Sequence, residues 1–228
     1  MKKIVISTGA GVSAESGIAT FRDSGGMWER YPVMEVASAD GFARNPALVH
    51  EFYNMRRKEL LKAQPNAAHY GLVELERDFD VRIITQNVDD LHERAGSRNV
   101  LHLHGELMKV RSMKNANRIY TLTADNIETT VDTRDEYGDH VRPHIVFFQE
   151  AVPNIEPAIE LVSQADIFVV IGTSLNVYPA AGLLHYVKSG TPIYYIDPKP
   201  AAVPANVNVI PLPATKGVER LIKILRNE

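Results

Sequence analysis

The chain has 228 residues, of which 45% are apolar and 23% charged, and its formal net charge is −3. These values exclude a disordered chain, allow a large buried core, and argue against a general affinity for nucleic acid. Cysteine is absent, which excludes disulfides, thiolate metal sites and a catalytic thiol.

The N-terminal segment MKKIVIS has an apolar stretch of about five residues, shorter than the ~7–15 residues of a secretory signal. No apolar run approaches the ~20 residues of a membrane span. We therefore expect a cytoplasmic protein that does not enter membranes, and a monomer by default.

The first predicted strand covers residues 3–7 and is followed by GAGVSAESGIATFR. Gly9, Gly11 and Ala14 satisfy the loose pattern G-x-G-x-x-[GA], in which small residues let a diphosphate approach the backbone. A packing turn of small residues is the alternative. A Walker loop is excluded because no G-K-[ST] follows, and a dehydrogenase is disfavoured because no second strand ends in Asp or Glu ~20 residues later. Residues 19–31 predict an ordered flap instead.

Further short β-branched runs predict strands buried on both faces, separated in several places by segments with helical spacing of apolar residues. The strands are predicted at residues 81–85, 100–103, 144–148, 167–171, 192–196 and 207–212, and the helices at 66–77, 155–164, 180–188 and 217–226. This alternation predicts an α/β fold with a Rossmann-like, doubly wound, mostly parallel sheet.

Two stretches interrupt the alternation. Residues 28–62 predict two or three helices, and residues 107–142 are polar and too long for a plain loop. We expect one catalytic domain over residues 1–228, in which these insertions form a small lobe. The large lobe would comprise about 1–27, 63–106 and 143–228.

Polar side chains follow two of the predicted strands. Gln86, Asn87, Asp89 and Asp90 come after the second strand, in ITQNVDDLHERAG. Because ligands of doubly wound sheets bind beyond the carboxyl ends of strands, these residues point to a site there, with helix capping as the alternative. Gly172, Thr173 and Ser174 follow a later strand and suit phosphate oxygens or ribose hydroxyls.

In LHLHGEL, His102 and His104 share one face of the predicted strand, and His104 sits last, beside Gly105. A histidine at a strand end facing a cleft is the best general-base candidate in the chain. A structural role is the alternative. Asp197 ends another predicted strand and suits a ribose hydroxyl.

Five segments in register resemble the sirtuin family of NAD-dependent protein lysine deacylases: GAGVSAESGIATFR, TQNVDDLHERAG, LHLHGEL, RPHIVFFQE and GTSLNVYPAA. The resemblance implies that NAD and an acyl-lysine meet between a Rossmann-type lobe and a small lobe. It assigns catalysis to His104, Asn87 and Asp89. The cofactor-binding residues it implies are Gly9, Ala10, Gly11, Ala14, Phe21, Arg22, Gln86, Asn87, Val88, Asp89, Gly172, Thr173, Ser174, Asp197, Lys216, Gly217 and Val218.

The resemblance also implies a mechanism without an enzyme nucleophile, which suits a chain that has no cysteine. The acyl oxygen attacks the nicotinamide ribose, nicotinamide leaves, and His104 accepts a proton from a ribose hydroxyl. An extended peptide would bind as an added strand, with Val146, Phe148 and Val177 lining the lysine tunnel. Plain core packing is the alternative for the two valines.

Tyr53 and Arg56 are spaced i, i+3 on a predicted helix and match the Tyr-x-x-Arg pair of the desuccinylase and demalonylase branch. Their phenol and guanidinium groups suit an acyl carboxylate. Ala37 falls where that branch keeps a small residue. The alternative is a solvated helix face. We expect desuccinylation and demalonylation alongside deacetylation.

The sequence departs from the family pattern at three places. Ser112 stands where the first of four zinc-binding cysteines would fall, His140 alone cannot hold zinc, and we expect no zinc, with packing of RIYTLT against a neighbouring strand instead. Tyr195 occupies the Asn position of the ribose motif. Gln149 replaces the glycine of Phe-Gly-Glu, which would stiffen the peptide-facing loop.

Other functional classes remain open from the sequence. A mono-ADP-ribosyltransferase would share the NAD site but not the acyl-lysine tunnel. A non-catalytic protein that binds NAD or ADP-ribose would not need His104 and Asn87. Acylated lysine side chains of other proteins are the partners expected from the resemblance.

Overall fold

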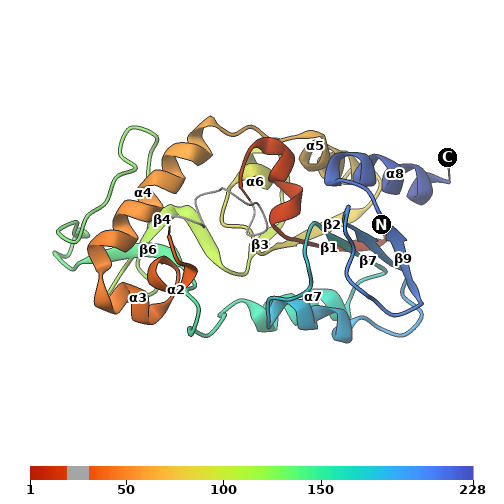
Figure 1. Ribbon diagram of the computed structural model, residues 1–228. Helices are drawn as coiled ribbons and strands as arrows, with labels where there is room; N and C mark the ends of the chain where they lie inside the picture. The colour runs from red at the N-terminus through yellow and green to blue at the C-terminus, as the bar shows by residue number, and fades with distance from the viewer. Residues whose placement is uncertain (20–30, 228) are drawn as a thin grey trace.

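The computed structural model describes residues 1–19 and 31–227, and it has a large lobe built on a parallel sheet and a small lobe to its left in Figure 1. The large sheet has six strands in the order β3-β2-β1-β7-β8-β9. These are β1 (Lys3–Thr8), β2 (Asp80–Thr85), β3 (Val100–His102), β7 (Ile167–Ile171), β8 (Ile193–Ile196) and β9 (Val207–Ile210). The predicted doubly wound sheet is confirmed.

The order of the strands reverses between β1 and β7, which pair in parallel with Thr8 opposite Ile171. On the other side of β1, Thr8 lies opposite Thr85 of β2, and Thr85 lies opposite His102 of β3. The carboxyl ends of four neighbouring strands therefore finish level with one another. In open α/β sheets this reversal point is where ligands bind.

Helices cover both faces of the sheet. One face packs against α5 (Ala67–Leu75) and α8 (Ala214–Arg226), and the other against α7 (Ile155–Ser163) and η3 (Ala180–Tyr186). These elements match the helices predicted at residues 66–77, 155–164 and 217–226. The segment predicted as a helix at 180–188 is a 3₁₀ helix. The short helices η1 (Ala10–Val12), η2 (Ala14–Ser16) and α6 (Leu91–Ala95) follow β1 and β2.

The small lobe contains the helices α2 (Val33–Val36), α3 (Ala39–Arg44) and α4 (Pro46–Lys62). They pack on a three-stranded antiparallel sheet of β5 (Ile119–Thr121), β4 (Gly105–Ser112) and β6 (Val141–Ile145), in that order. Between residues 31 and 62 the structure describes three helices, and RIYTLT pairs with β4, as predicted. The sheet begins at Gly105 and ends at Ile145, slightly outside the predicted 107–142.

One predicted strand is corrected by the structure. Residues 144–148 were expected as a strand of the large sheet, but β6 is Val141–Ile145 and pairs with β4 of the small sheet. Its burial alternates, because it faces helices on one side only. A short apolar run does not distinguish the two environments.

Two helices of the small lobe begin at capping residues. The Ser38 side chain accepts a hydrogen bond from Gly41 N at the start of α3, and the Asn45 side chain accepts one from Leu48 N at the start of α4. Pro46, at the first position of α4, needs no hydrogen-bond acceptor there. Within the described residues, no helix is long and apolar enough to cross a membrane.

Candidate active site

The glycine turn after β1 packs against the end of β7. Gly9 N donates to Ile171 O at 2.9 Å, and Gly11 N donates to Gly172 O at 2.8 Å. A Cβ atom on Gly11 would lie 2.6 Å from Gly172 Cα, and Gly172 itself has φ +63°. Packing alone thus requires these glycines, as the alternative interpretation held, and their proximity to a diphosphate stays a prediction.

Asn87 is buried where the carboxyl ends of β1 and β2 meet. Its side-chain Nδ2 donates to Ser13 Oγ at 3.1 Å, and its backbone N donates to Thr85 Oγ1 at 3.0 Å. Thr85 Oγ1 in turn accepts a hydrogen bond from Thr8 Oγ1 at 2.9 Å. Because the amide nitrogen donates to Ser13, the orientation of the side chain is fixed and its amide oxygen can accept a hydrogen bond from a ligand.

Ser13 lies between Asn87 and His69. His69 Nδ1 accepts from Asn66 N at 3.2 Å in a capping box, so its proton is on Nε2, which lies 3.5 Å from Ser13 Oγ. Burial lowers the pKa of His69 to about 4, which keeps the ring neutral. Burial raises the pKa of Asp89, and hydrogen bonds from Leu91 N and the Ser13 hydroxyl oppose that rise.

His104 follows β3 and faces the same strand ends. Its Nδ1 lies 3.1 Å from Gln86 O and must donate to that carbonyl, so the lone pair of the neutral ring is on Nε2. Burial lowers the pKa of His104 below 6.5, and the Gln86 hydrogen bond only partly opposes this. The ring is therefore an unprotonated base at neutral pH.

The segment after β7 is fixed to this cluster from two sides. Thr173 Oγ1 accepts from Leu175 N at 3.2 Å, and Gln86 Nε2 lies 3.4 Å from it. Tyr195 OH donates to Thr173 O at 2.8 Å and accepts from Ala201 N at 3.2 Å. Tyr195 therefore supports Thr173 from behind, a role the sequence did not reveal.

Other predicted cofactor-binding residues lie after β8 and on α8. Asp197 is buried, and its Oδ1 accepts from Lys199 N at 2.8 Å. Gly217 and Val218 pack in the core, since a Cβ atom on Gly217 would lie 2.1 Å from Ile196 Cγ2, while Lys216 is exposed. Their place near adenine stays a prediction. Phe21 and Arg22 lie outside the described residues.

Three of the predicted substrate residues, Ala37, Val146 and Phe148, lie on segments that backbone hydrogen bonds join to each other or to His104. Phe148 N donates to Ala37 O at 2.8 Å, and Ala39 N donates to Phe148 O at 3.1 Å. Val146 N donates to His104 O at 3.0 Å. Phe148 is exposed and Val177 half-buried. The segment 146–148 thus connects the candidate base to the small residue Ala37.

Tyr53 and Arg56 lie on α4, in the small lobe. Tyr53 is 2% exposed, and burial raises its pKa to about 12, so the phenol keeps its proton. Arg56 is partly exposed, and its guanidinium carbon lies 5.9 Å from the centre of the Phe52 ring. Burial lowers the pKa of Arg56, and the negative charge of Asp89 opposes the change. Arg56 is thus close enough to Asp89, two residues after Asn87, for the two charges to interact.

Comparison with known proteins agrees with this arrangement. The sequence profile of the Sir2 family matches residues 9–179. The chain belongs to the Sir2 family. An NAD-dependent protein deacylase of Bacteroides thetaiotaomicron is 54% identical over 99% of this chain and 98% of the relative, and one of Helicobacter pylori strain 26695 is 51% identical over 97% and 96%.

Solved Sir2 structures share the fold as well as the sequence. A Sir2 homologue in complex with NAD is 40% identical, with a TM-score of 0.89 over 99% of this chain and 90% of the homologue. A Sir2 protein with a deacetylated p53 peptide and 3′-O-acetyl ADP-ribose is 32% identical, with a TM-score of 0.81 over 97% and 92% of the two chains. The predicted family is confirmed.

Arg57, next to Arg56, has a different role that the sequence prediction missed. It is fully buried, and its Nε donates to Leu107 O at 2.8 Å. Its Nη1 donates to Asn54 Oδ1 at 2.8 Å and to Ile127 O at 3.1 Å. The sequence could have indicated this role, because Arg57 lies between Tyr53 and Leu60 on the apolar side of α4, where a charged side chain needs hydrogen-bond partners.

At the tip of this Sir2 small lobe, Ser112 accepts hydrogen bonds where a zinc-binding cysteine is expected. Its Oγ accepts from Lys114 N at 3.2 Å and from Arg118 Nη2 at 3.0 Å. Arg118 also pairs with Asp135 at 3.3 Å and with Asp139. No group of three or more metal-ligating side chains occurs in residues 1–19 or 31–227, and zinc-free folding remains a prediction.

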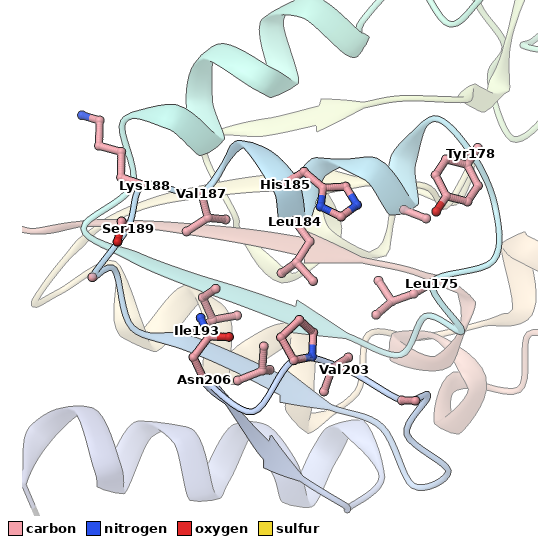
Figure 2. A pocket seen from close by; sticks show the side chains of 15 residues that line it. Leu175, Tyr178, Leu184, His185, Val187, Lys188, Ser189, Ile193, Val203 and Asn206 are labelled. Atoms are coloured by element: carbon pink, nitrogen blue, oxygen red, sulfur yellow. The ribbon is translucent and has the colours of Figure 1, made fainter.

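A separate surface cavity of about 350 Å³ lies between η3 and the segment before β9 (Figure 2). Leu175, Leu184, Ile193 and Val203 point into it, and Tyr178 stands at its edge. None of the cofactor-binding candidates that the structure describes lines this cavity. The candidate Sir2 active site is therefore not the space shown in Figure 2.

Proposed function

We propose that this Sir2 enzyme removes succinyl and malonyl groups, as well as acetyl groups, from lysine side chains of proteins, with release of nicotinamide and O-acyl-ADP-ribose. The broader activity is NAD-dependent protein deacylation, for which relatives more than 50% identical over nearly the whole chain are named. The observation that carries the proposal is a charged Arg56 beside a protonated Tyr53 at the junction that Ala37 and Phe148 form.

The residues at the strand ends fit NAD. The turn at Gly9 and Gly11 brings backbone against Gly172 at the reversal of strand order, the position where doubly wound sheets bind dinucleotides. Asp197 supplies a buried carboxylate at the end of β8, suited to ribose hydroxyls. When bound, NAD supplies the electrophilic ribose carbon and the leaving nicotinamide.

The chain itself supplies orientation and a base. His104 Nε2 accepts a proton from a ribose hydroxyl, because Nδ1 is held by Gln86 O and burial keeps the ring unprotonated. The amide oxygen of Asn87 faces the same space, since its nitrogen is bound to Ser13. No protein nucleophile is required.

Acyl preference would come from the small lobe. A protonated Tyr53 donates one hydrogen bond, and the guanidinium of Arg56 donates two in a fixed fork that matches a carboxylate. Ala37 leaves room for a longer acyl chain than a bulky residue would. An acetyl group offers these donors no partner, so it gains nothing from them.

The test compares Arg56→Met with Lys62→Met, an exposed position on the same helix. Products are followed by mass with acetyl-, succinyl- and malonyl-lysine peptides. Arg56→Met should reduce kcat/KM on succinyl- and malonyl-lysine by about 10²-fold, the value of a charged hydrogen-bonded pair, and change the acetyl value far less.

Lys62→Met should match the wild-type protein on all three peptides. Equal losses by Arg56→Met on every peptide would refute the acyl preference and leave the deacylase activity standing. ADP-ribosylated protein without peptide deacylation would refute both.

A further inference from the structure

Two histidines, the last residue of β3 and the second residue after it, hold the short segment of backbone that follows β2. His104 Nδ1 lies 3.1 Å from Gln86 O, and His102 Nδ1 lies 3.1 Å from Asn87 O. The two rings are two residues apart and bind successive carbonyls. Together they fix the backbone that carries Gln86 and Asn87.

The second ring nitrogen distinguishes the two histidines. His102 Nε2 lies 2.8 Å from Glu93 Oε1, on α6, and forms an ion pair with it. A carbonyl and a carboxylate are both acceptors, so His102 makes both bonds only when both nitrogens carry protons. His104 has a single acceptor on Nδ1 and needs a single proton. Both rings therefore bind a backbone carbonyl through Nδ1, but His102 carries two protons and is a cation, whereas His104 carries one and can act as a base.

We propose that His102 and Glu93 form a proton-dependent clamp that positions Asn87 through its backbone carbonyl. This inference rests on the proposed deacylase function for its kinetic consequence. Neither residue touches the reacting atoms. His102 is a positioning residue, and Glu93 acts by holding the second proton on it.

The surroundings of His102 favour the doubly protonated ring. Burial by itself lowers the pKa of His102, but Glu93 and then Glu106 of β4 raise it above 6.5. Asp89 adds a further negative charge nearby, while His92 of α6 stays neutral because burial lowers its pKa. Burial raises the pKa of Glu93, but the hydrogen bond from His102 and the positive charges of His102 and Lys109 bring that pKa below its usual value.

Loss of one proton must break one of the two contacts. If Nδ1 is deprotonated, its lone pair faces the Asn87 carbonyl, and if Nε2 is deprotonated, its lone pair faces the Glu93 carboxylate. Either change loosens the segment that carries Asn87. Turnover should therefore fall at the alkaline end of the pH profile, as His102 loses its second proton, while the acid end follows His104.

The protonation states are tested on the full chain without any ligand, by nitrogen NMR of ¹⁵N-histidine-labelled protein. At pH 7, both nitrogens of His102 should show imidazolium shifts, and His104 should show one protonated and one bare nitrogen. His102→Asn and His104→Asn assign the signals. A neutral His102 at pH 7 would overturn the clamp, whatever the enzyme's substrate.

The kinetic test uses variants that keep different contacts. In His102→Asn, the side-chain amide replaces Nδ1–H and does not titrate, but the contact with Glu93 is lost, so kcat should fall less than in His102→Leu and the alkaline fall should disappear. In Glu93→Gln, the amide can donate to a neutral His102, with the same result. His102→Leu loses both contacts and should lower kcat by about 10- to 100-fold at every pH, the cost of a misplaced group.

His185→Asn, at an exposed histidine of η3, is the matched control and should keep the wild-type profile. The clamp is refuted if the alkaline fall persists unchanged in both His102→Asn and Glu93→Gln, or if His102→Leu has the wild-type kcat. A wild-type protein that forms no O-acyl-ADP-ribose would refute the proposed function instead, and the NMR result would still decide the protonation of His102.

Discussion

The catalytic segment, residues 85–104, and the small-lobe tip, residues 112–140, both hold irregular backbone in place, but by different means. In the catalytic segment, the buried Thr85 and Asn87 and the half-buried His104 each pair with a defined donor or acceptor, and His102 has an acceptor at each ring nitrogen. At the tip, Arg118 and Lys114 pair with Asp135 and Asp139. In the catalytic segment, hydrogen bonds of fixed direction place reactive atoms, whereas the ion pairs at the tip hold chain segments together.

The largest effect should come from His104→Asn, in the catalytic segment. The asparagine amide can still donate to Gln86 O, as Nδ1 does, so the backbone keeps its anchor while the base is removed. We expect kcat to fall by about 10²- to 10⁴-fold, the usual contribution of general base catalysis. Steady-state deacylation of an acetyl-lysine peptide measures it.

The same residue sets the acid end of the wild-type pH profile. A histidine whose pKa is lowered stays unprotonated as the pH falls, so the midpoint of the acid limb of kcat/KM should lie below 6.5. Thermal unfolding is the control, because His104→Asn should unfold within a few degrees of the wild-type protein. A large loss of stability would mean that His104 supports the fold rather than the chemistry.

The fold of the catalytic region could be predicted closely from the sequence, for a physical reason. Strands of a parallel sheet are covered on both faces, so they appear as continuous apolar runs, and polar residues after them must lie at one edge. Asn87 and His104 were found in this way. The strand at residues 144–148 was placed in the wrong sheet, because its apolar run lies mostly after β6, whose own sequence VRPHI alternates in burial and faces a helix layer on one side only.

Contacts that depend on partners distant in sequence could not be predicted. Tyr195 appeared to be a departure from the ribose motif, but its hydroxyl supports the carbonyl of Thr173, 22 positions earlier. The pairing of His102 with Glu93 and Asn87 required the geometry of α6 and β3 together. Which of two adjacent arginines faces the site depends on the rotation of α4, which separates Arg56 from Arg57.

The second largest effect should come from Arg57→Met, at the base of the small lobe. Removal of the guanidinium leaves Leu107 O, Ile127 O and Asn54 Oδ1 without this donor in a buried region. The apolar replacement partly offsets the loss, so we expect the free energy of unfolding to fall by about 2–4 kcal/mol. Urea unfolding measures it, with Lys62→Met as the control on the same helix.

At a temperature where Arg57→Met is fully folded, its kcat on an acetyl peptide should stay within about twofold of the wild-type value. This would show that the contacts of α4 with residues 107–129 hold the lobe without placing reactive atoms. A loss of kcat comparable with that of His104→Asn would remove the distinction between the two regions.

The smallest effect should come from Arg118→Gln, at the small-lobe tip. Arg118 joins Ser112, Asp135 and Asp139, and because its side chain is 20% exposed, water and salt screen these ion pairs in part. We expect the melting temperature to fall by about 2–4 °C, with a smaller difference from the wild-type protein in 1 M salt, and kcat to be unchanged.

If the tip depends on these contacts and not on a metal, EDTA should leave the wild-type melting temperature unchanged, and elemental analysis should find no stoichiometric zinc. A chelator-induced fall would show that a metal holds the tip, so that Arg118 and Ser112 are only part of what replaces the missing cysteines.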